Sequence, residues 1–377
     1  MISVKNVRPT TRRPPPLRTG LLLPAGAALL GGLDAAMLLL GLPAPVTTDR
    51  LPEVHGMLMV LGFVGALVCL ERSVALGRRV GYLAPALLGI GGVLLLSPAP
   101  LVAGKAALVA GMVGMCGIYV PLWRRQRDDA VLVQALGAVL GAGAATMWLG
   151  GLDIPPMLPW LAGFLVLTIA GERLELARLA LGPKAGPTLV LLSSGLLAGA
   201  VASLLWPAVG YPLLGLDLVA LTAWLLGHDV ARRTIRARGL TRFMAASMLA
   251  GWAWLLVAGT VWTVHGAALD GPAYDAVIHA TFLGFTISMV MAHAPVILPS
   301  VVRRPLPYRP VLWVPLVLLH ASLLVRLWLG DGLGMHPAWQ LGGVLNVVAL
   351  LLFVGLAAWS VAAAGRHGSA AVTGRAA

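Results

Sequence analysis

Apolar segments long enough to cross a lipid bilayer follow one another along almost the entire sequence. A membrane-spanning helix needs about 17 to 25 mostly apolar residues, and inside the bilayer a helix satisfies its own backbone hydrogen bonds. The sequence therefore predicts an all-α polytopic membrane protein with about twelve transmembrane helices, numbered 1 to 12 below. These helices are expected near residues 18–41, 53–74, 80–98, 101–122, 130–150, 157–179, 188–207, 211–229, 243–265, 273–298, 310–330 and 338–363.

The low charge content supports this class and leaves little room for a separate soluble domain. Charged residues make up 11% of the chain and hydrophobic residues 59%, whereas a soluble globular protein carries about 25% charged residues. The loops between the apolar segments are short and rich in Gly and Pro, which favour turns. We therefore expect one transmembrane domain over residues 18–363, a basic N-terminal tail over 1–17 and a C-terminal tail over 364–377. The first apolar segment lacks a convincing cleavage site, so we expect it to remain as helix 1.

The Lys and Arg residues fall mostly in alternate loops. Their excess gives a formal net charge of +13, which on its own would suggest a nucleic-acid partner. Because cytoplasmic loops of membrane proteins are enriched in Lys and Arg, the alternation instead predicts an orientation. We expect a multi-pass protein in the lipid bilayer of the bacterial plasma membrane, with both termini in the cytoplasm and no nucleic-acid partner. Three basic residues fall on the outer side: Arg50, Lys105 and Arg326.

A Gly-Phe pair recurs in predicted helices 2, 6 and 10, and each time seven residues separate it from a charged or titratable position. The three copies are Gly62-Phe63 with Glu71-Arg72, Gly163-Phe164 with Glu172-Arg173, and Gly284-Phe285 with His293. A period of four helices argues against a transporter of the major facilitator type, whose halves repeat by six. It favours three pseudo-repeated four-helix arcs, with helices 2, 6 and 10 facing a common centre.

Two of the repeat helices carry a histidine near their outer start. His55 precedes its Gly-Phe pair by seven residues and His279 precedes its own by five. One interpretation is that the two imidazoles are axial ligands of a haem b between helices 2 and 10. The other is that each histidine hydrogen-bonds a neighbouring helix or interfacial water. A copper site is a further alternative, in which the outer-side His265 and His336 join one of them.

A second group of titratable residues is expected near the cytoplasmic ends of the same helices. Glu71, Glu172 and His293 should lie about 20 Å from the outer histidines, at 1.5 Å per residue. We expect Glu71-Arg72 and Glu172-Arg173 to form structural ion pairs within or between helix ends; a metal or proton site with His293 is the alternative. His320, in the middle of helix 11, is expected to be a hydrogen-bonded core residue.

The residues around the two outer histidines resemble two families of membrane haem proteins. The pattern His-Gly-x-x-Met from His55 to Met59 resembles helix 2 of the haem-copper oxidase catalytic subunit, a twelve-helix protein of three pseudo-symmetric arcs. That family holds its low-spin haem with histidines of helices 2 and 10, which correspond here to His55 and His279. The chain is also similar to the NnrS family of twelve-helix haem- and copper-containing proteins associated with nitric oxide stress. This likeness rests on the His55 segment with its Gly-Phe pair, and on the His279 helix with its basic exit Arg303-Arg304.

The sequence also departs from both families. Oxidases hold their active-site copper with histidines on helices 6 and 7, whereas residues 157–207 contain none. Helix 10 lacks the His-x-His pair that would ligate two haems, and the NnrS family's second histidine close to His55 is missing. The resemblance therefore implies one haem b without the oxidase copper site, and it identifies no catalytic residue.

Two further charged residues are candidates for supporting a haem. Arg326 ends helix 11 on the outer side, where oxidase-like proteins use arginines for haem propionates; its alternative role is an interfacial anchor. Asp34 lies inside helix 1 and is expected to hydrogen-bond a ligand histidine, to accept a proton, or to make a structural bond to a neighbouring helix.

The predicted function is that of an NnrS-like haem-binding membrane protein, with copper as a second candidate metal, in nitric oxide stress or redox homeostasis. A respiratory or electron-transfer partner is implied by this role. The alternative is a small-molecule transporter of the plasma membrane, supported by the twelve helices and by Asp34, His320 and Asn346 within them. A third candidate is an assembly factor for a respiratory complex. The four-helix repeat and the matched level of the two outer histidines favour the first.

Overall fold

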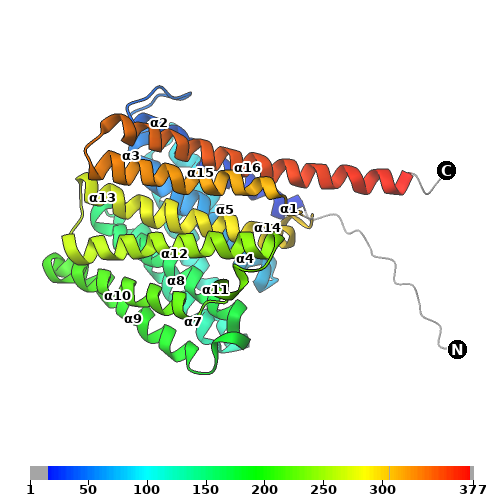
Figure 1. Ribbon diagram of the computed structural model, residues 1–377, viewed down its shortest axis with the longest axis horizontal. Coiled ribbons are helices and arrows are strands. Elements are labelled where there is room, and N and C mark those ends of the chain that lie inside the picture. The colour runs from blue at the N-terminus through cyan, green and yellow to red at the C-terminus, as the bar shows by residue number, and fades with distance from the viewer. Residues whose placement is uncertain (1–15, 305, 374–377) are drawn as a thin grey trace.

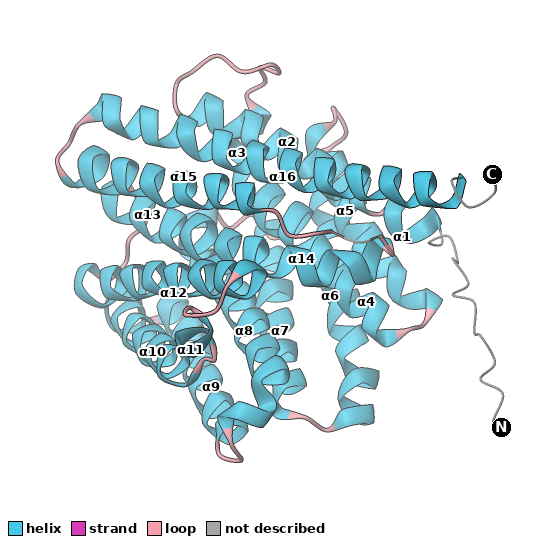
Figure 2. Ribbon diagram, turned by 45° about the vertical axis from the view of Figure 1, so that its right-hand side comes forward, coloured by secondary structure: helices cyan, strands magenta, loops and turns pink. Residues whose placement is uncertain are grey.

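The computed structural model describes residues 16–304 and 306–373, and every regular element in these residues is a helix (Figures 1 and 2). In chain order the elements are α1 (Pro16–Gly20), α2 (Leu22–Leu39), α3 (Arg50–Met57), η1 (Leu58–Gly65), α4 (Ala66–Leu76), η2 (Arg79–Tyr82), α5 (Leu83–Leu96), α6 (Leu101–Gln126), α7 (Asp129–Leu149), α8 (Ile154–Leu181), α9 (Ala185–Leu205), α10 (Pro207–His228), α11 (Ala231–Thr234), α12 (Gly239–His265), α13 (Gly271–Ile278), η3 (His279–Ile287), α14 (Ser288–Val302), η4 (Pro310–Leu312), α15 (Trp313–Leu324), η5 (Val325–Gly332) and α16 (His336–Thr373).

The predicted class, an all-α polytopic membrane protein, is confirmed. Within the described residues, twelve helices are long and apolar enough to span a bilayer. Helix 2 is composed of α3, η1 and α4, and helix 10 of α13, η3 and α14, each as one continuous rod. The main difference is in helix 12, because α16 continues past position 363 to Thr373. Most of the expected N-terminal tail lies outside the described residues.

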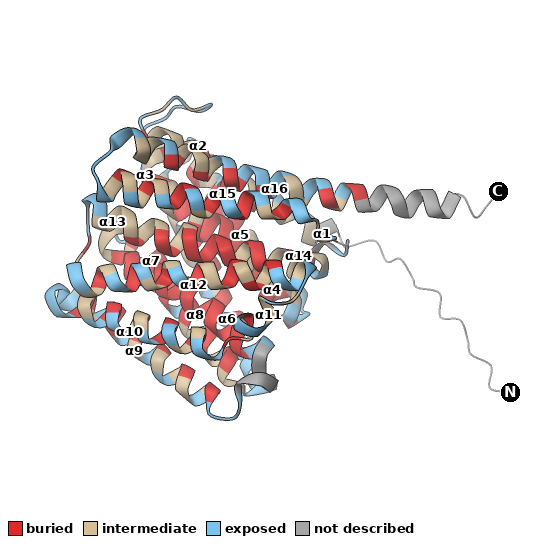
Figure 3. Ribbon diagram, in the orientation of Figure 1, coloured by how far each residue is buried: buried red, intermediate tan, exposed pale blue. Residues whose placement is uncertain are grey.

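Helices 2, 6 and 10 form the centre of the bundle. In the most apolar 18-residue stretch of each of these helices, 67%, 78% and 61% of the residues are buried. For each of the other nine spans found in the described chain the share is 56% or less. Figure 3 shows the same distribution, with buried residues concentrated in the middle of the bundle and exposed residues on the outer helices. This arrangement agrees with the inward-facing positions expected from the Gly-Phe repeat.

The glycine of each Gly-Phe pair packs against the helix that precedes its own. A methyl group built on Gly62 would lie 3.1 Å from Ala28 of helix 1, and one on Gly163 would lie 2.5 Å from Leu140 of helix 5. The third, on Gly284, would lie 2.4 Å from Trp254 of helix 9. The missing side chain therefore allows close contact between helix pairs 1–2, 5–6 and 9–10. The phenylalanines that follow are all buried: Phe63, Phe164 and Phe285.

Two of the central helices change locally from α to π geometry at the level of the outer histidines. The π segment η1 starts three residues after His55, and η3 starts at His279 itself. A third π segment, η5, ends helix 11 and contains Arg326. Wide helical turns of this kind are frequent at functional sites. The apolar periodicity of the sequence did not predict them.

The first described helix, α1, and the C-terminal end of α16 lie at the same end of the bundle (Figure 1). We call this the basic end, because the arginine-rich loops with Arg78, Arg232 and Arg303 lie there. The three basic residues of the opposite end all have partners. Arg50 donates to the carbonyls of Ser97 and Ala99. Lys105 donates to the Trp148 carbonyl at 3.1 Å and lies over its ring, and Arg326 pairs with Asp275.

Candidate functional site

His55 and His279 line the same cavity between helices 2 and 10. The space, with its open side included, measures about 690 Å³. Most of its wall is apolar, and polar groups enter it from helices 10, 11 and 12. The lining side chains include Met59, Phe282, Thr286, Arg326 and Asn346.

Both imidazole rings are fixed by their Nδ1 atoms. His55 Nδ1 lies 2.8 Å from the Gly32 carbonyl oxygen of helix 1, and His279 Nδ1 lies 2.9 Å from the Asp275 carbonyl oxygen one turn earlier. A carbonyl only accepts, so Nδ1 carries the proton and donates in each case. In the neutral ring Nε2 then keeps its lone pair, which is the arrangement usual for a metal-ligating histidine.

Arg326 adds a buried positive charge to the same cavity. Its side chain is 9% exposed and makes a two-pronged ion pair with Asp275, with Nε–Oδ2 at 2.8 Å and Nη2–Oδ1 at 2.7 Å. The guanidinium also lies over the Trp339 ring at 4.8 Å. Because Asp275 additionally contacts His279 Nδ1 at 3.2 Å, one carboxylate links the arginine to the histidine. An exposed interfacial anchor would have neither this burial nor this pair.

The other predicted outer-side residues lie away from this cavity. Asp34 Oδ2 accepts from the Val46 amide at 3.0 Å and thereby fastens the loop after helix 1. The partner of His55 is thus the Gly32 carbonyl. His265 lines an exposed groove beside helices 9 to 11, and His336 is exposed and stacks on Trp339. The described residues contain no group of three or more His, Cys, Asp or Glu arranged to hold a metal ion.

A second cavity lies closer to the basic end, between helices 2, 6 and 10. It measures about 790 Å³ and brings together Glu71, Glu172 and His293, as the repeat predicted. We call it the inner cavity and the first one the outer cavity. Three side chains line both of them, one from each central helix: Val64, Leu165 and Thr286.

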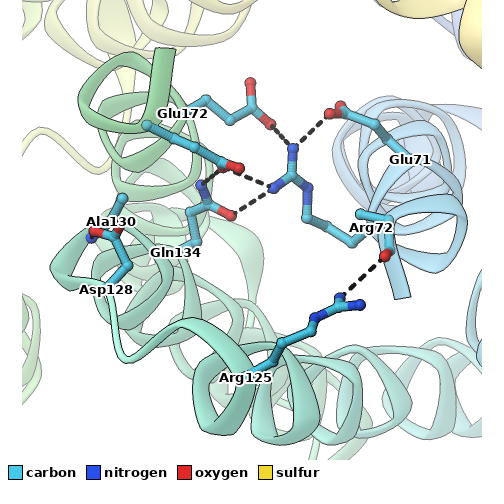
Figure 4. A network of polar contacts seen from close by, with 9 residues as sticks. Glu71, Arg72, Arg125, Asp128, Ala130, Gln134 and Glu172 are labelled. Carbon is cyan, nitrogen blue, oxygen red and sulfur yellow. Dashed lines mark hydrogen bonds and ion pairs between the residues drawn. The ribbon is translucent and has the colours of Figure 1, made fainter. Parts of the chain in front are cut away.

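The glutamates form the predicted ion pairs with Arg72 (Figure 4). Arg72 Nη2 lies 2.5 Å from Glu71 Oε1 and 3.7 Å from Glu172 Oε1, and Nη1 lies 3.2 Å from Glu175 Oε2. Gln134 of helix 5 accepts from the same Nη1 at 3.0 Å. The sequence analysis missed Gln134 and Glu175, because their contact with Arg72 joins positions 62 and 103 residues apart.

Arg173 does not join this cluster. It forms a separate two-pronged pair with Asp229, with both N–O distances at 3.0 Å. The repeated Glu-Arg dipeptides therefore differ in role: the arginine of the first copy compensates the central glutamates, whereas that of the second fixes the end of helix 8.

The two remaining histidines of the central region differ in their bonding. His293 Nδ1 donates to the Met289 carbonyl at 2.8 Å, and its Nε2 is buried without a hydrogen-bond partner among the described residues. His320 accepts from Trp254 Nε1 at 2.9 Å and faces Ser288 Oγ at 3.4 Å. His320 is therefore the bonded core residue that was expected, while His293 has a free acceptor.

One polar residue that the sequence analysis passed over is Asp217, in the middle of α10. Its Oδ2 is buried without a hydrogen-bond partner within the described chain, and its Oδ1 lies against Gly195 of the neighbouring helix. An acid inside a membrane helix is costly and is a functional candidate by default. Its position within an apolar segment was the signal that could have identified it.

A family described as "Domain of unknown function (DUF8744)" matches residues 18–362, which covers all twelve spans apart from the end of helix 12. No curated protein matches the chain significantly.

Proposed function

The chain belongs to the DUF8744 family, and from this premise we propose that it is an integral membrane protein that binds one haem b between helices 2 and 10. The observation that carries the proposal is the shared cavity of His55 and His279, in which each ring is held by Nδ1 and keeps Nε2 for a ligand. Two facing helices of a bundle can supply one axial imidazole each.

The residues around the outer cavity fit this group. The apolar wall, including Met59 and Phe282, suits a flat macrocycle, and Arg326 offers a guanidinium whose Nη1 takes no part in the pair with Asp275. Such a nitrogen can donate to a propionate. Asn346 is anchored by its Nδ2, which donates to Ser322 Oγ, and its buried Oδ1 remains an acceptor. A haem with two imidazole ligands supplies one-electron transfer.

We extend the proposal to the cellular role that the resemblance implies. The protein would serve nitric oxide tolerance or redox homeostasis in the manner of the NnrS family, in the bacterial plasma membrane and with an electron-transfer partner. The basic end would face the cytoplasm, because Lys and Arg are retained on that side. The proposal includes no copper site, because His265 and His336 lie outside both cavities.

An absorption spectrum of the purified protein, oxidised and then reduced, tests the haem proposal. We expect the low-spin spectrum of a b-type haem. His55→Ala or His279→Ala should abolish that spectrum, because losing one of two axial ligands opens a coordination position. The matched control is His293→Ala, which removes an imidazole with the same Nδ1 bond from the other cavity. A wild-type protein free of haem after expression in a haem-replete host would refute the proposal, and so would a spectrum lost only in His293→Ala.

A second candidate function is transport of a small molecule. It is favoured by the two cavities, which follow one another along the central helices and share three lining residues. Uptake or release of a substrate by proteoliposomes that contain haem-free protein would support transport over haem binding.

A further inference from the structure

We propose that the inner cavity is a separate binding site for a membrane-soluble hydroquinone, whose hydroxyl groups donate hydrogen bonds to His293 and Glu172. The proposal does not depend on haem in the outer cavity. It rests on three properties of the inner cavity: an apolar wall, polar groups that present hydrogen-bond acceptors, and a buried acceptor without a partner among the described residues.

The wall of the inner cavity is suited to a lipophilic molecule. Of its 18 lining residues, 13 are aliphatic residues or methionine, contributed by helices 1, 2, 6 and 10. Burial of apolar surface would therefore supply most of the affinity, and the few polar groups would supply the selectivity.

The polar side chains that line the inner cavity present acceptors. His293 uses Nδ1 as a donor to Met289, so Nε2 of the neutral ring accepts. Thr168 Oγ donates to Phe164, and Thr286 Oγ donates to Thr281, so each hydroxyl proton is already used by the backbone of its own helix. The two glutamates accept from Arg72 or lie close to it. A ligand that matches this cavity must donate.

The buried Nε2 of His293 points to a ligand. The residue is 6% exposed, lines the cavity, and leaves this nitrogen without a hydrogen bond among the described residues. A buried acceptor without a donor loses the hydrogen bonds that it would make in water, and a bound donor would restore one of them. Glu172 reaches the same space from helix 6, so two acceptors on different helices face one cavity. A hydroquinone, with a hydroxyl at each end of an apolar ring, can address both.

A lipophilic ammonium ion is a donor too, but the charges favour the neutral molecule. Arg72 already contacts Glu71 at 2.5 Å and Glu172 at 3.7 Å, so both carboxylates of the cavity have a buried cation next to them. Moving another full charge into an apolar space costs far more than moving a hydroxyl that finds an acceptor.

The test is a calorimetric titration of the full-length protein in detergent with three ligands of equal alkyl chain length: a hydroquinone kept reduced, its dimethyl ether, and a primary ammonium. Micelle partitioning is subtracted with protein-free samples. We expect the hydroquinone to bind about tenfold more tightly than the ether, which cannot donate. Equal affinities, or no binding by either, would mean that the space holds water or lipid only. Preferential binding of the ammonium would also overturn the proposal.

Variants of residues in the two cavities test whether the hydroquinone binds in the inner cavity. His293→Leu removes the acceptor and keeps an apolar side chain, so the preference for the hydroquinone should fall about tenfold. His293→Gln restores an acceptor oxygen and should recover part of it. The control is His228→Leu, which replaces an exposed histidine of α10 outside both cavities, and this variant should bind as the wild type does.

Loss of the preference in His279→Ala but not in His293→Leu would assign the ligand to the outer cavity. If the leucine variant does not fold, the hydroquinone–ether comparison on the wild type still decides. Because both ligands are compared on haem-free protein as well, failure of the haem proposal leaves this test intact.

Discussion

Three histidines of the central helices make the same kind of hydrogen bond and differ in where its acceptor lies. His55, His279 and His293 each donate from Nδ1 to a backbone carbonyl. In the last two the acceptor is four residues earlier in the same helix, so the ring orientation follows from local geometry. For His55 the acceptor is Gly32, 23 residues away on helix 1. The ring of His55 therefore depends on how two helices pack, and that dependence is why the sequence could locate this residue but not its partner.

Arg72 is the residue on which the balance of buried charge depends. Replacing it with Met leaves three glutamates around a site without a cation, and breaking a buried pair in this way costs about 3–5 kcal/mol of stability. We expect a corresponding drop in the thermal unfolding temperature in detergent. Arg125→Met is the control: that exposed side chain donates to the Ala75 carbonyl, so the change should stay within about 0.5 kcal/mol.

A double variant separates lost charge from lost packing. If uncompensated glutamate charge causes the drop, Arg72→Met combined with Glu172→Gln should recover part of the stability, because one buried charge is removed with the cation. Equal unfolding temperatures for Arg72→Met and Arg125→Met would contradict the assigned role of Arg72.

The glycines of the repeat determine how closely neighbouring helices approach. In Gly284→Ala the new methyl would lie 2.4 Å from Trp254 Cγ and 2.7 Å from its Cβ, which cannot move without displacing the bond from Trp254 to His320. Overpacking of this kind costs about 1–3 kcal/mol. In Gly163→Ala the nearest atom is the end of the Leu140 side chain, which is flexible, so a smaller loss is expected.

Gly117→Ala is the matched control for this pair, because among the described residues no atom beyond the adjoining turns of its own helix lies within 4 Å of the added methyl, and the residue is exposed on α6. Alanine is the better helix former by about 1 kcal/mol, so this variant should be as stable as the wild type or more stable. The thermal unfolding temperatures of the three variants, measured in one detergent, give their order of stability. The packing described for the repeat would be wrong if Gly284→Ala were as stable as Gly117→Ala.

The helices were predictable because each one must be long and apolar to cross a bilayer, and a long run of consecutive apolar residues can be recognised in the sequence. The π segments were not, since the widened turns at η1 and η3 place side chains for contacts between helices and leave no local pattern. The candidate site shows the same division. The level of His55, His279 and His293 followed from spacing along helices 2 and 10, whereas the contacts of Arg72 with Gln134 and Glu175 join helices 2, 5 and 6.

The whole molecule is a bundle whose two ends differ in charge, and this difference predicts its orientation in the membrane. In a variant without the native Cys69 and Cys116, Thr47→Cys places a thiol in the exposed loop after helix 1, and Arg238→Cys places one in the exposed loop before helix 9. A membrane-impermeant maleimide should label Thr47→Cys in intact cells and label Arg238→Cys only after the cells are broken. The reverse pattern would place the basic end outside.

The partners of the basic residues at the opposite end bear on the order in which the protein is assembled. Chains are synthesised from the N-terminus, so a residue that is translocated can meet only partners that already exist. Arg326 follows Asp275 by 51 residues, whereas Arg50 precedes the carbonyl of Ser97 by 47. With the orientation proposed above, Arg326 emerges next to a carboxylate already in position, while Arg50 must be carried across during biogenesis before helix 3 has supplied its acceptors. Insertion of the first two helices is therefore a step of synthesis at which the chain carries a translocated cation whose carbonyl acceptors have yet to be synthesised; Lys105, whose acceptor Trp148 follows it by 43 residues, meets the same situation later.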